Sequence, residues 1–153
     1  MDSDFAIYNT VVGDLKIDYK NQLLLGIEKV EHTRERGTTT IFSDSVFKNL
    51  QEYFAGKRKE FSINYEIKGS EFQMKVWKEL EKISYGTTKS YKEIAINIGC
   101  EKATRAVGGA IHRNPIGIII PCHRVIGSNN KLVGYAGGVD MKIKLLKIEK
   151  ILD

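Results

Sequence analysis

The chain has 153 residues, enough for one domain or two very small ones. Hydrophobic residues make up 42% and charged residues 28%, a composition that can bury a core. No apolar stretch reaches the roughly 18 residues of a transmembrane helix, and the acidic N-terminus lacks the basic and apolar regions of a secretory signal. Two cysteines, Cys100 and Cys122, are too few for a disulfide scaffold, and the cysteines and histidines lack zinc-type spacing. We therefore expect a cytoplasmic protein with reduced thiols, no membrane span and no metal.

The net charge of +5 is concentrated in the second half of the chain. Residues 1–69 carry 10 Lys and Arg against 11 Asp and Glu, whereas residues 70–153 carry 14 against 8. A basic half favours a polyanionic partner such as nucleic acid. Many lysine-rich surfaces serve only solubility, so charge alone leaves both interpretations open.

The first part of the chain predicts a small antiparallel sheet followed by a helix. Three β-rich runs, separated by the turn residues Gly13-Asp14 and Asn21-Gln22, predict strands over residues 5–12, 15–19 and 23–30. After a polar loop over residues 32–40, apolar residues recur at helical spacing from Ser45 until Gly56 ends the helix.

A change of hydrophobic period marks the expected domain boundary. Over residues 61–67 apolar and polar residues alternate strictly, which predicts a half-buried strand. Beyond Lys68-Gly69 the spacing of apolar residues becomes helical. We therefore expect one domain over residues 1–68 and a second over residues 69–153.

The second domain begins with helices that carry clear start signals. Ser70 with Gln73, and Ser90 with Glu93, have the spacing of capping boxes, in which the first side chain caps the helix N-terminus. The helix after Ser90 ends at a glycine, and another over residues 102–112 follows almost at once. Two short helices across a turn that contains glycine are typical of a helix-turn-helix.

The helix over residues 102–112 has two unlike faces. We expect its core face to consist of the apolar residues at helical spacing, Ala103, Ala106, Val107, Ala110 and Ile111. The opposite face carries Thr104, Arg105, Gly108, Gly109 and His112. Two adjacent glycines inside a helix cost about 1 kcal/mol each relative to alanine. They therefore indicate a close approach, either of a DNA backbone or of another part of the same protein.

A short apolar segment leads to a cysteine with basic neighbours. Residues 114–121 are too few for a membrane span and too irregular for an amphipathic helix, and two prolines restrict the backbone. The segment therefore predicts a buried stretch that delivers Cys122 to a defined place. His123 and Arg124 supply a positive environment, which lowers the pKa of a thiol. Because neighbours in sequence need not touch, the pattern fits either a reactive thiolate or an inert buried cysteine.

The motif Pro121-Cys122-His123-Arg124-Val125 resembles the active-site signature of the O6-alkylguanine-DNA alkyltransferases, also called methylated-DNA–protein-cysteine methyltransferases. The similarity continues, in order and with compatible spacing, through Phe72-Gln73, Val76-Trp77, Ser90-Tyr91, the run Arg105 to Ala110, Asn114-Pro115 and the run Gly134 to Gly138. It covers residues 70–150, and the ordered set is far more specific than the signature alone. The first 69 residues match the family only in outline.

The resemblance implies an α+β protein of two domains that repairs DNA. The N-terminal domain would be a small antiparallel sheet with a helix, ribonuclease-H-like, and the C-terminal domain helical and winged-helix-like, with a helix-turn-helix. Its partner would be double-stranded DNA that contains O6-alkylguanine, and action on O4-alkylthymine is left open. The damaged base would be flipped out, because its alkylated oxygen is inaccessible while stacked, and the alkyl group would pass irreversibly to Cys122. We expect a monomer that needs no cofactor.

The resemblance also assigns catalytic roles to Cys122, His123, Glu149, Tyr91 and Asn114. Cys122 would be the nucleophile, His123 would remove its proton through a water, and Glu149 would orient His123. Tyr91 would donate a proton to the leaving guanine, and Asn114 would brace the turn that holds the cysteine. From the residues alone, Glu149 is more simply a solvated glutamate in the final helix, at the edge of its apolar face. Tyr91 is, on the same grounds, an ordinary inner-face aromatic.

By the same resemblance, DNA binding falls to Arg105, Thr104, Lys92, Gly108, Gly109 and Ser128, and the substrate pocket to Tyr135, Val125 and Ala136. Arg105 would enter the duplex and fill the space of the flipped base, while Lys92 and Ser128 would contact phosphates. Tyr135 would close over the alkyl group. Ile111 is either a wedge in the base stack or a core residue, and its register favours the core.

Three departures from the family pattern are visible. Ala136 stands where many relatives have a serine that hydrogen-bonds the guanine oxygen, so a backbone group would have to replace it. Cys100 occupies a turn where relatives often carry polar DNA-contacting residues, and we interpret it as incidental. The N-terminal half lacks the Cys and His set that binds a structural zinc in some relatives.

Two functions of other classes remain as alternatives. An alkyltransferase-like protein that binds the lesion without reacting would lack the cysteine of the signature, so Cys122 argues against it. A transcription regulator that uses only its helix-turn-helix would leave residues 121–124 without a purpose.

Overall fold

The computed structural model describes residues 3–31, 34–132 and 134–153. As the sequence predicts, the chain is α+β, and its internal contacts divide it into unit 1, Met1–Ile67, and unit 2, Lys68–Asp153. This division falls one residue before the predicted boundary. No helix among the described residues has the length and apolar character needed to cross a membrane.

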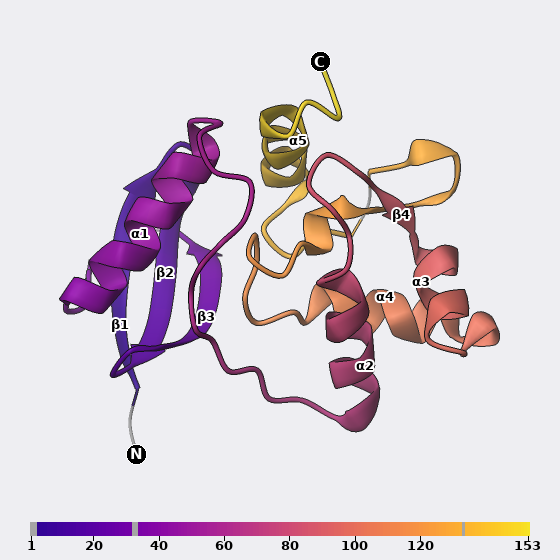
Figure 1. Cartoon of the computed structure of the whole chain (residues 1–153), viewed down its shortest axis with the longest axis horizontal. Helices are drawn as coiled ribbons and strands as arrows, with labels where there is room; N and C mark the ends of the chain where they lie inside the picture. Colours follow the sequence, from indigo (N-terminus) through magenta and orange to yellow (C-terminus); the bar gives the residue numbers. More distant parts are fainter. Residues whose placement is uncertain (1–2, 32–33, 133) are drawn as a thin grey trace. The chain divides into compact units, whose positions relative to one another are not determined.

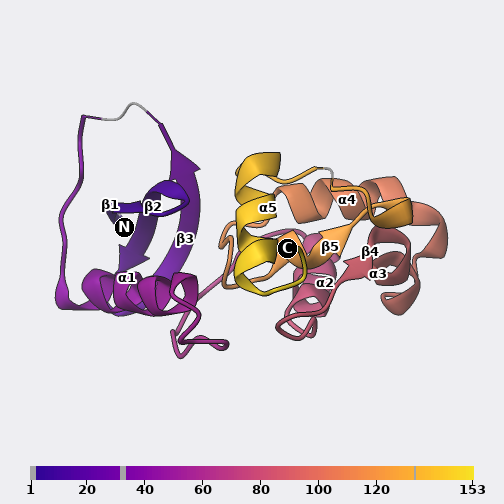
Figure 2. The same cartoon turned by 90° about the horizontal axis from the view of Figure 1, so that it is seen from above.

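Unit 1 is a three-stranded antiparallel sheet with one helix against it (Figures 1 and 2). The strands β1 (Asp4–Thr10), β2 (Gly13–Lys20) and β3 (Leu23–Val30) lie in chain order, and α1 (Ile41–Phe54) follows. Their shared core consists of fully buried residues, among them Leu15, Ile17 and Leu24 of the sheet and Val46, Leu50 and Tyr53 of the helix. The sheet and helix predicted for this half are confirmed.

The first hairpin turns earlier than predicted. Thr10 pairs with Gly13, so Val11 and Val12 form the turn and Gly13 already belongs to β2. The Thr10 hydroxyl donates to the Gly13 carbonyl at 2.7 Å and accepts from the Val12 amide at 3.1 Å, which closes the turn. Gly13 has a φ of +111°, which explains a glycine at this position. The turn predicted at Asn21-Gln22 is confirmed.

Helix α1 begins at Ile41, four residues before the predicted start at Ser45. Thr40 caps it, because its hydroxyl accepts from the Ser43 amide at 3.1 Å and Ser43 Oγ accepts from the Thr40 amide at 2.8 Å. The third helical residue is a serine, whereas a capping box usually has Glu or Gln there, so the usual sequence pattern does not predict this helix start.

The strand predicted over residues 61–67 is not formed. The burial of these residues alternates as expected, but a single bridge joins Tyr65 to Leu24 of β3. Alternation reports which side chains face inward and says nothing of backbone pairing, which here stops after two hydrogen bonds to Leu24. On the opposite edge, Arg36 and Thr38 bond to the backbone of β1. Both sheet edges are therefore partly covered by irregular segments, which protects them from pairing with other chains.

Unit 2 is mainly helical. Its elements are α2 (Glu71–Leu80), β4 (Lys89–Ser90), α3 (Tyr91–Asn97), a 3₁₀ turn η1 (Glu101–Ala103), α4 (Thr104–His112), η2 (Cys122–Arg124), β5 (Val125–Ile126), η3 (Ser128–Asn130) and α5 (Val139–Ile148). The short strands β4 and β5 pair in parallel, and α2, α3 and α4 pack on one another. A buried hydrogen bond of 2.8 Å from Trp77 Nε1 to the Ala110 carbonyl joins α2 to α4.

The predicted start signals of α2 and α3 are borne out in different degrees. Ser70 and Gln73 form a reciprocal capping box. Ser90 accepts from the Glu93 amide at 3.0 Å, whereas the Glu93 carboxylate forms an ion pair with Lys89 at 3.7 Å.

The helix predicted over residues 102–112 is divided. A 3₁₀ turn covers Glu101–Ala103, and the α-helix begins at Thr104. Ala106 is exposed and does not join the core, contrary to expectation, because at about 3.6 residues per turn it falls at the edge of the buried face formed by Val107, Ala110 and Ile111. Val107, Ala110 and Ile111 are buried, so Ile111 packs in the core and does not stand out as a wedge.

Candidate active site and nucleic-acid groove

The segment before Cys122 is fixed by buried isoleucines and by hydrogen bonds of the Asn114 side chain. Ile116, Ile118 and Ile120 are fully buried, as the sequence predicts for this stretch. The Asn114 side chain donates to the Ile120 carbonyl at 2.8 Å and accepts from the Ile116 amide at 3.1 Å, so it closes the loop from both sides. Ile118 has a φ of +73°, a strained value for a β-branched residue. The chain therefore uses side-chain bonds and stored strain to place Cys122 at the start of η2.

Five residues with polar or reactive side chains form a buried cluster: Cys122, His123, Arg124, Lys142 and Glu149, each at most 6% exposed. Glu149 lies at its centre. One carboxylate oxygen is 2.6 Å from His123 Nε2 and 3.1 Å from Arg124 Nη2, and the other accepts from Arg124 Nε at 2.8 Å and from the Gly86 amide at 3.0 Å. Arg124 also donates to the Ile83 carbonyl at 2.7 Å. The opposite charges of Arg124 and Glu149 are therefore matched inside the protein.

The position of Glu149 corrects the sequence-based expectation. Helix α5 ends at Ile148, and the Glu149 amide still bonds to the Leu145 carbonyl at 3.1 Å, so Glu149 continues the buried face formed by Lys142, Leu145 and Leu146. It is 3% exposed, which excludes the simpler interpretation of a solvated glutamate. The chain turns at Lys150, which has a φ of +61°.

In the pair of His123 and Glu149, the carboxylate is ionised and the imidazole is neutral. Burial acts to raise the pKa of Glu149, but the bonds from His123, Arg124 and Gly86 outweigh it and lower the pKa to about 2. Burial also lowers the pKa of His123, against the influence of Glu149. An ionised Glu149 can only accept, so the neutral imidazole must carry its proton on Nε2. We therefore assign the tautomer whose Nδ1 keeps a basic lone pair.

The thiol of Cys122 is harder to ionise than its neighbours in sequence suggest. Burial raises its pKa, opposed by a hydrogen bond from the Asn114 side chain and by the charge of Lys142. His123 is neutral and Arg124 is paired with Glu149, so their side chains do not supply the positive charge that the sequence pattern predicts, and burial outweighs the hydrogen bond from the His123 backbone that lowers the pKa of the thiol. A protonated buried thiol needs a base before it can attack.

Two tyrosines lie close enough to Cys122 for its charge to affect them. Burial, followed by the charge of Cys122, raises the pKa of Tyr91 and raises that of Tyr135 well above its ordinary value. Tyr91 is half-buried and Tyr135 is buried. A Cβ at Gly134 would lie 3.2 Å from the Tyr91 hydroxyl, and Gly134 has a φ of +68°. Glycine at this position therefore lets the loop approach the phenol.

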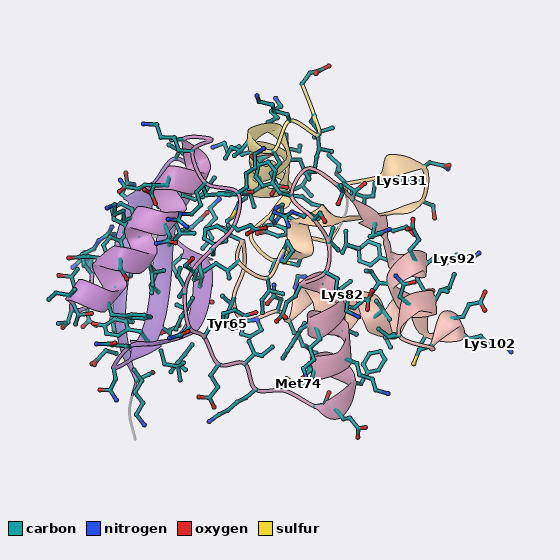
Figure 3. All side chains as sticks on the ribbon, viewed as in Figure 1. Tyr65, Met74, Lys82, Lys92, Lys102 and Lys131 are labelled. Atoms are coloured by element: carbon teal, nitrogen blue, oxygen red, sulfur yellow. The ribbon has the colours of Figure 1, made fainter. Side chains whose placement is uncertain are left out.

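A groove of about 440 Å³ opens between α3, α4 and the loop after β5. We call it the α4 groove. It is lined by Ser90, Tyr91, Lys92, Thr104, Arg105, Gly108, His112, Gly127, Ser128 and Gly134. Five of the six residues that the sequence assigned to DNA binding are among them, and Tyr91 links the groove to the surroundings of Cys122. Figure 3 shows Lys92, Lys102 and Lys131 on the same side of this unit.

Comparison with known proteins identifies the family of the chain. The family model described as "6-O-methylguanine DNA methyltransferase, DNA binding domain" matches residues 71–151. A methylated-DNA–protein-cysteine methyltransferase of Methanosarcina acetivorans is 44% identical over 152 residues, which cover 95% of this chain and 97% of the relative. The constitutive enzyme of that name from Bacillus subtilis is 49% identical over 125 residues, 81% of this chain and 74% of its own. The chain belongs to the methylated-DNA–protein-cysteine methyltransferase family.

Solved structures of this methyltransferase family share the fold. The O6-methylguanine methyltransferase of Mycobacterium tuberculosis superposes with a TM-score of 0.89 at 39% identity, over 97% of this chain and 93% of that one. A crystal structure of the same organism's protein in complex with DNA gives a TM-score of 0.86, over 95% and 92% of the two chains.

Not all of the expected site residues of this methyltransferase lie together. Gly109 is exposed but does not line the α4 groove, and nothing lies within 4 Å of the position of a Cβ there. Ala136 is exposed, whereas Val125 is fully buried and presents its carbonyl to Lys142. Cys100 is half-buried in the turn between α3 and α4, with its sulfur 3.8 Å from the Ile98 carbonyl.

Two residues at the site escaped the sequence-based assignment. Lys142 is fully buried, and its Nζ donates to the Val125 carbonyl at 2.5 Å. Burial lowers the pKa of Lys142 to about 8, against the influence of Cys122. Its only signal in the sequence is a position three and four residues before Leu145 and Leu146, on the buried stripe of α5. His112 lines the α4 groove and was assigned to the outer face of its helix without a role.

Proposed function

We propose that the protein repairs double-stranded DNA by transferring the alkyl group of O6-alkylguanine irreversibly to Cys122. The observation that carries the proposal is the hydrogen-bonded pair of His123 and Glu149, buried in the same cluster as Cys122, in a unit that also has a groove with basic side chains. The methyltransferases to which the chain is similar support the reaction, and the M. tuberculosis protein in complex with DNA supports the partner.

Proton removal falls to His123. The pKa of the Cys122 thiol is raised by burial, so at neutral pH the sulfur carries its proton. Neutral His123 accepts that proton through a water, and Glu149, ionised and 2.6 Å away, stabilises the imidazolium that forms. Lys142 contributes a positive charge that favours the resulting thiolate.

The transfer is a displacement at carbon. The thiolate sulfur attacks the alkyl carbon, a carbon–sulfur bond forms, and the bond from that carbon to guanine O6 breaks. The electron pair of the broken bond stays on guanine, which then takes up a proton. Burial and the charge of Cys122 raise the pKa of Tyr91 and keep its phenol protonated, so Tyr91 can supply this proton. The thioether product has no easy reverse reaction, so each molecule acts once.

The α4 groove holds the duplex while the base leaves the stack. A stacked guanine hides O6 from any side chain, so the nucleotide must be flipped. Arg105 is exposed at the groove and enters the duplex in place of the flipped base. Thr104, Lys92, Gly108 and Ser128 line the same groove and contact the backbone, and Gly109 lies exposed beside it. Tyr135 closes over the alkyl group, next to Val125 and Ala136.

The remaining expectations belong to the same proposal. The protein acts as a monomer, needs no cofactor, and works in the cytoplasm, where thiols stay reduced. A lesion-binding protein that does not react is disfavoured by Cys122, since such a protein lacks this cysteine and has no need of the buried pair of His123 and Glu149 in the same cluster. A transcription regulator has no use for such a cluster.

The decisive experiment is an intact-mass measurement after incubation with O6-benzylguanine or with duplex DNA that contains O6-methylguanine. We expect one benzyl or one methyl adduct, mapped to Cys122 by peptide mass. Cys122→Ser should bind DNA but gain no mass, because a serine hydroxyl stays protonated. Cys100→Ser, the matched control, should react like the parent protein. Adduct formation that persists in Cys122→Ser and disappears in Cys100→Ser would overturn the proposal.

A further inference from the structure

The segment between α2 and β4 contains a tight turn over residues 84–87, which we call the 84–87 turn. It is closed by two bonds to the Ser84 carbonyl, from the Thr87 amide at 3.1 Å and from the Thr87 hydroxyl at 2.7 Å. Gly86 has a φ of +78°, and its amide donates to Glu149 Oε1 at 3.0 Å. A Cβ at Gly86 would lie at an ordinary 3.8 Å from the Glu149 carbonyl oxygen, so backbone conformation and not space explains this glycine. The turn therefore directs a backbone donor at the carboxylate of the buried cluster.

Tyr85, in the same turn, contacts both Arg124 and the end of α5. Its ring lies over the Arg124 guanidinium, whose Cζ is 5.7 Å from the ring centroid, within the distance of about 6 Å at which a cation and an aromatic face attract each other. Its hydroxyl donates to the Ile148 carbonyl at 3.3 Å, which is longer than the usual range of about 2.5–3.0 Å. Burial and the charge of Glu149 raise the pKa of the Tyr85 phenol, opposed by Arg124. The ring therefore makes the stronger of the two contacts.

These contacts fix both members of the buried ion pair. Arg124 donates twice to Glu149 and once, at 2.7 Å, to the Ile83 carbonyl just before the turn. The Tyr85 ring covers the guanidinium, so Arg124 is held between the carboxylate and this segment of the chain. Since Arg124 and Glu149 move together, loss of the ring would let the guanidinium shift and draw the carboxylate away from its 2.6 Å bond with His123.

We propose that Tyr85 is a positioning residue for alkyl transfer, whose ring holds Arg124, and through it the Glu149 carboxylate, in the geometry in which His123 accepts the proton of the thiol. The inference rests on the proposed function, because it requires His123 as the base. The charged groups that act on His123 are Glu149, Arg124 and Lys142, and Tyr85 contacts one of them directly. Tyr85 does not line the α4 groove, so its effect belongs to the chemistry and not to the binding of DNA.

The test measures single-turnover rates with free O6-benzylguanine, which needs no duplex, from about pH 6 to pH 10. Tyr85→Leu should slow transfer about 10-fold to 100-fold near neutral pH, because a displacement of about 1 Å can cost about 10²-fold. The loss should shrink at high pH, where the thiol ionises unaided. Tyr85→Phe keeps the ring and should lose at most about threefold, since it removes only a long hydrogen bond. Tyr85→Met, a second variant without a ring, should behave like Tyr85→Leu.

A double-mutant cycle separates positioning from damage to the fold. In the Glu149→Gln protein, Tyr85→Leu should cause little further loss of rate, because the carboxylate that it positions is already absent. Tyr65→Leu replaces a half-buried tyrosine of unit 1 and is the matched control. It should keep the rates and the pH profile of the parent protein.

Four results would overturn the inference: a parental rate in Tyr85→Leu, a loss that stays constant with pH, an equal loss in Tyr85→Phe, or losses that multiply in the double variant. In each of these cases the parent protein would still gain its adduct on Cys122, so the proposed function would stand. A parent protein that gains no mass from O6-benzylguanine or from duplex O6-methylguanine would instead remove the proposed function itself.

Discussion

The buried cluster and the α4 groove lie in the same unit and use charge in opposite ways. In the cluster, Glu149 receives four hydrogen bonds and Arg124 is neutralised by it, so that these two charges are matched by groups of the protein. In the groove, Lys92 and Arg105 meet no carboxylate among the described lining residues. Matched charges in a buried cluster tune proton transfer, whereas basic side chains at the surface can bind an anion. This difference supports the proposal that the cluster performs the chemistry and the groove recognises the duplex.

The largest effect should come from replacing His123, the proposed general base in the buried cluster. His123→Gln removes the proton acceptor, and general-base catalysis contributes about 10² to 10⁴-fold. We expect alkyl transfer to fall by that factor near neutral pH for both O6-benzylguanine and duplex substrate. The loss should shrink at high pH, where the thiol ionises unaided. A stopped-flow pH–rate profile measures this, and a loss that stays constant with pH would indicate structural damage instead.

The next effect concerns stability. Arg124→Met leaves the Glu149 carboxylate buried without its bidentate partner, and loss of one member of a buried pair costs about 3–5 kcal/mol. Urea unfolding should show this loss. The matched control is Arg36→Met, which breaks an exposed pair with Asp14 at 2.7 Å and should leave the unfolding midpoint nearly unchanged. Equal losses in the two variants would contradict the view that burial gives the Arg124 pair its importance.

Glu149 should also give the protein an acid-sensitive stability. Its pKa is lowered from 4.5 to about 2 on folding, so its contribution is present above about pH 4.5 and is lost as the pH falls through 2. At about 1.4 kcal/mol per pKa unit the full contribution is about 3 kcal/mol, and about 2 kcal/mol of it should be gone by pH 3. Urea unfolding at pH 5 and pH 3 checks this. Glu149→Gln should lose about 2 kcal/mol less stability between pH 5 and pH 3 than the parent protein. If the variant loses as much stability as the parent protein, the acid sensitivity comes from other carboxylates.

The smallest effect, restricted to one substrate, belongs to the groove. Arg105→Ala should slow repair of duplex O6-methylguanine by about 10²-fold, because unstacking a base costs a few kcal/mol in a duplex and nothing for a free base. Reaction with free O6-benzylguanine should remain nearly normal, since Arg105 does not belong to the buried cluster. Single-turnover rates on the two substrates measure the split. Equal losses on both substrates would mean that Arg105 supports the structure of the buried cluster and would contradict its role in base flipping.

Local patterns in the sequence determined most elements and singled out Cys122 as the proposed nucleophile. Ser70 with Gln73, the apolar spacing in α2 and the segment from Asn114 to Pro121 each depend on neighbours within a few residues, so they can be predicted without the fold. The ordered motifs around Cys122 identified the family, because their residue types and spacing are specific. The alternation over residues 61–67 was less informative, since it predicts burial but not the partner that a strand needs.

Only the tertiary structure decided how the site works. Glu149 lies 26 residues from His123, and the two meet only because the end of α5 packs against η2. Lys142 reads as one more lysine in a basic helix, yet the packing of α5 on η2 buries it completely and lowers its pKa to about 8. Burial likewise raises the pKa of Cys122, whose basic neighbours in sequence suggest the reverse. The free energy of removing a charge from water depends on every element that surrounds the charge, so no local pattern in the sequence determines it.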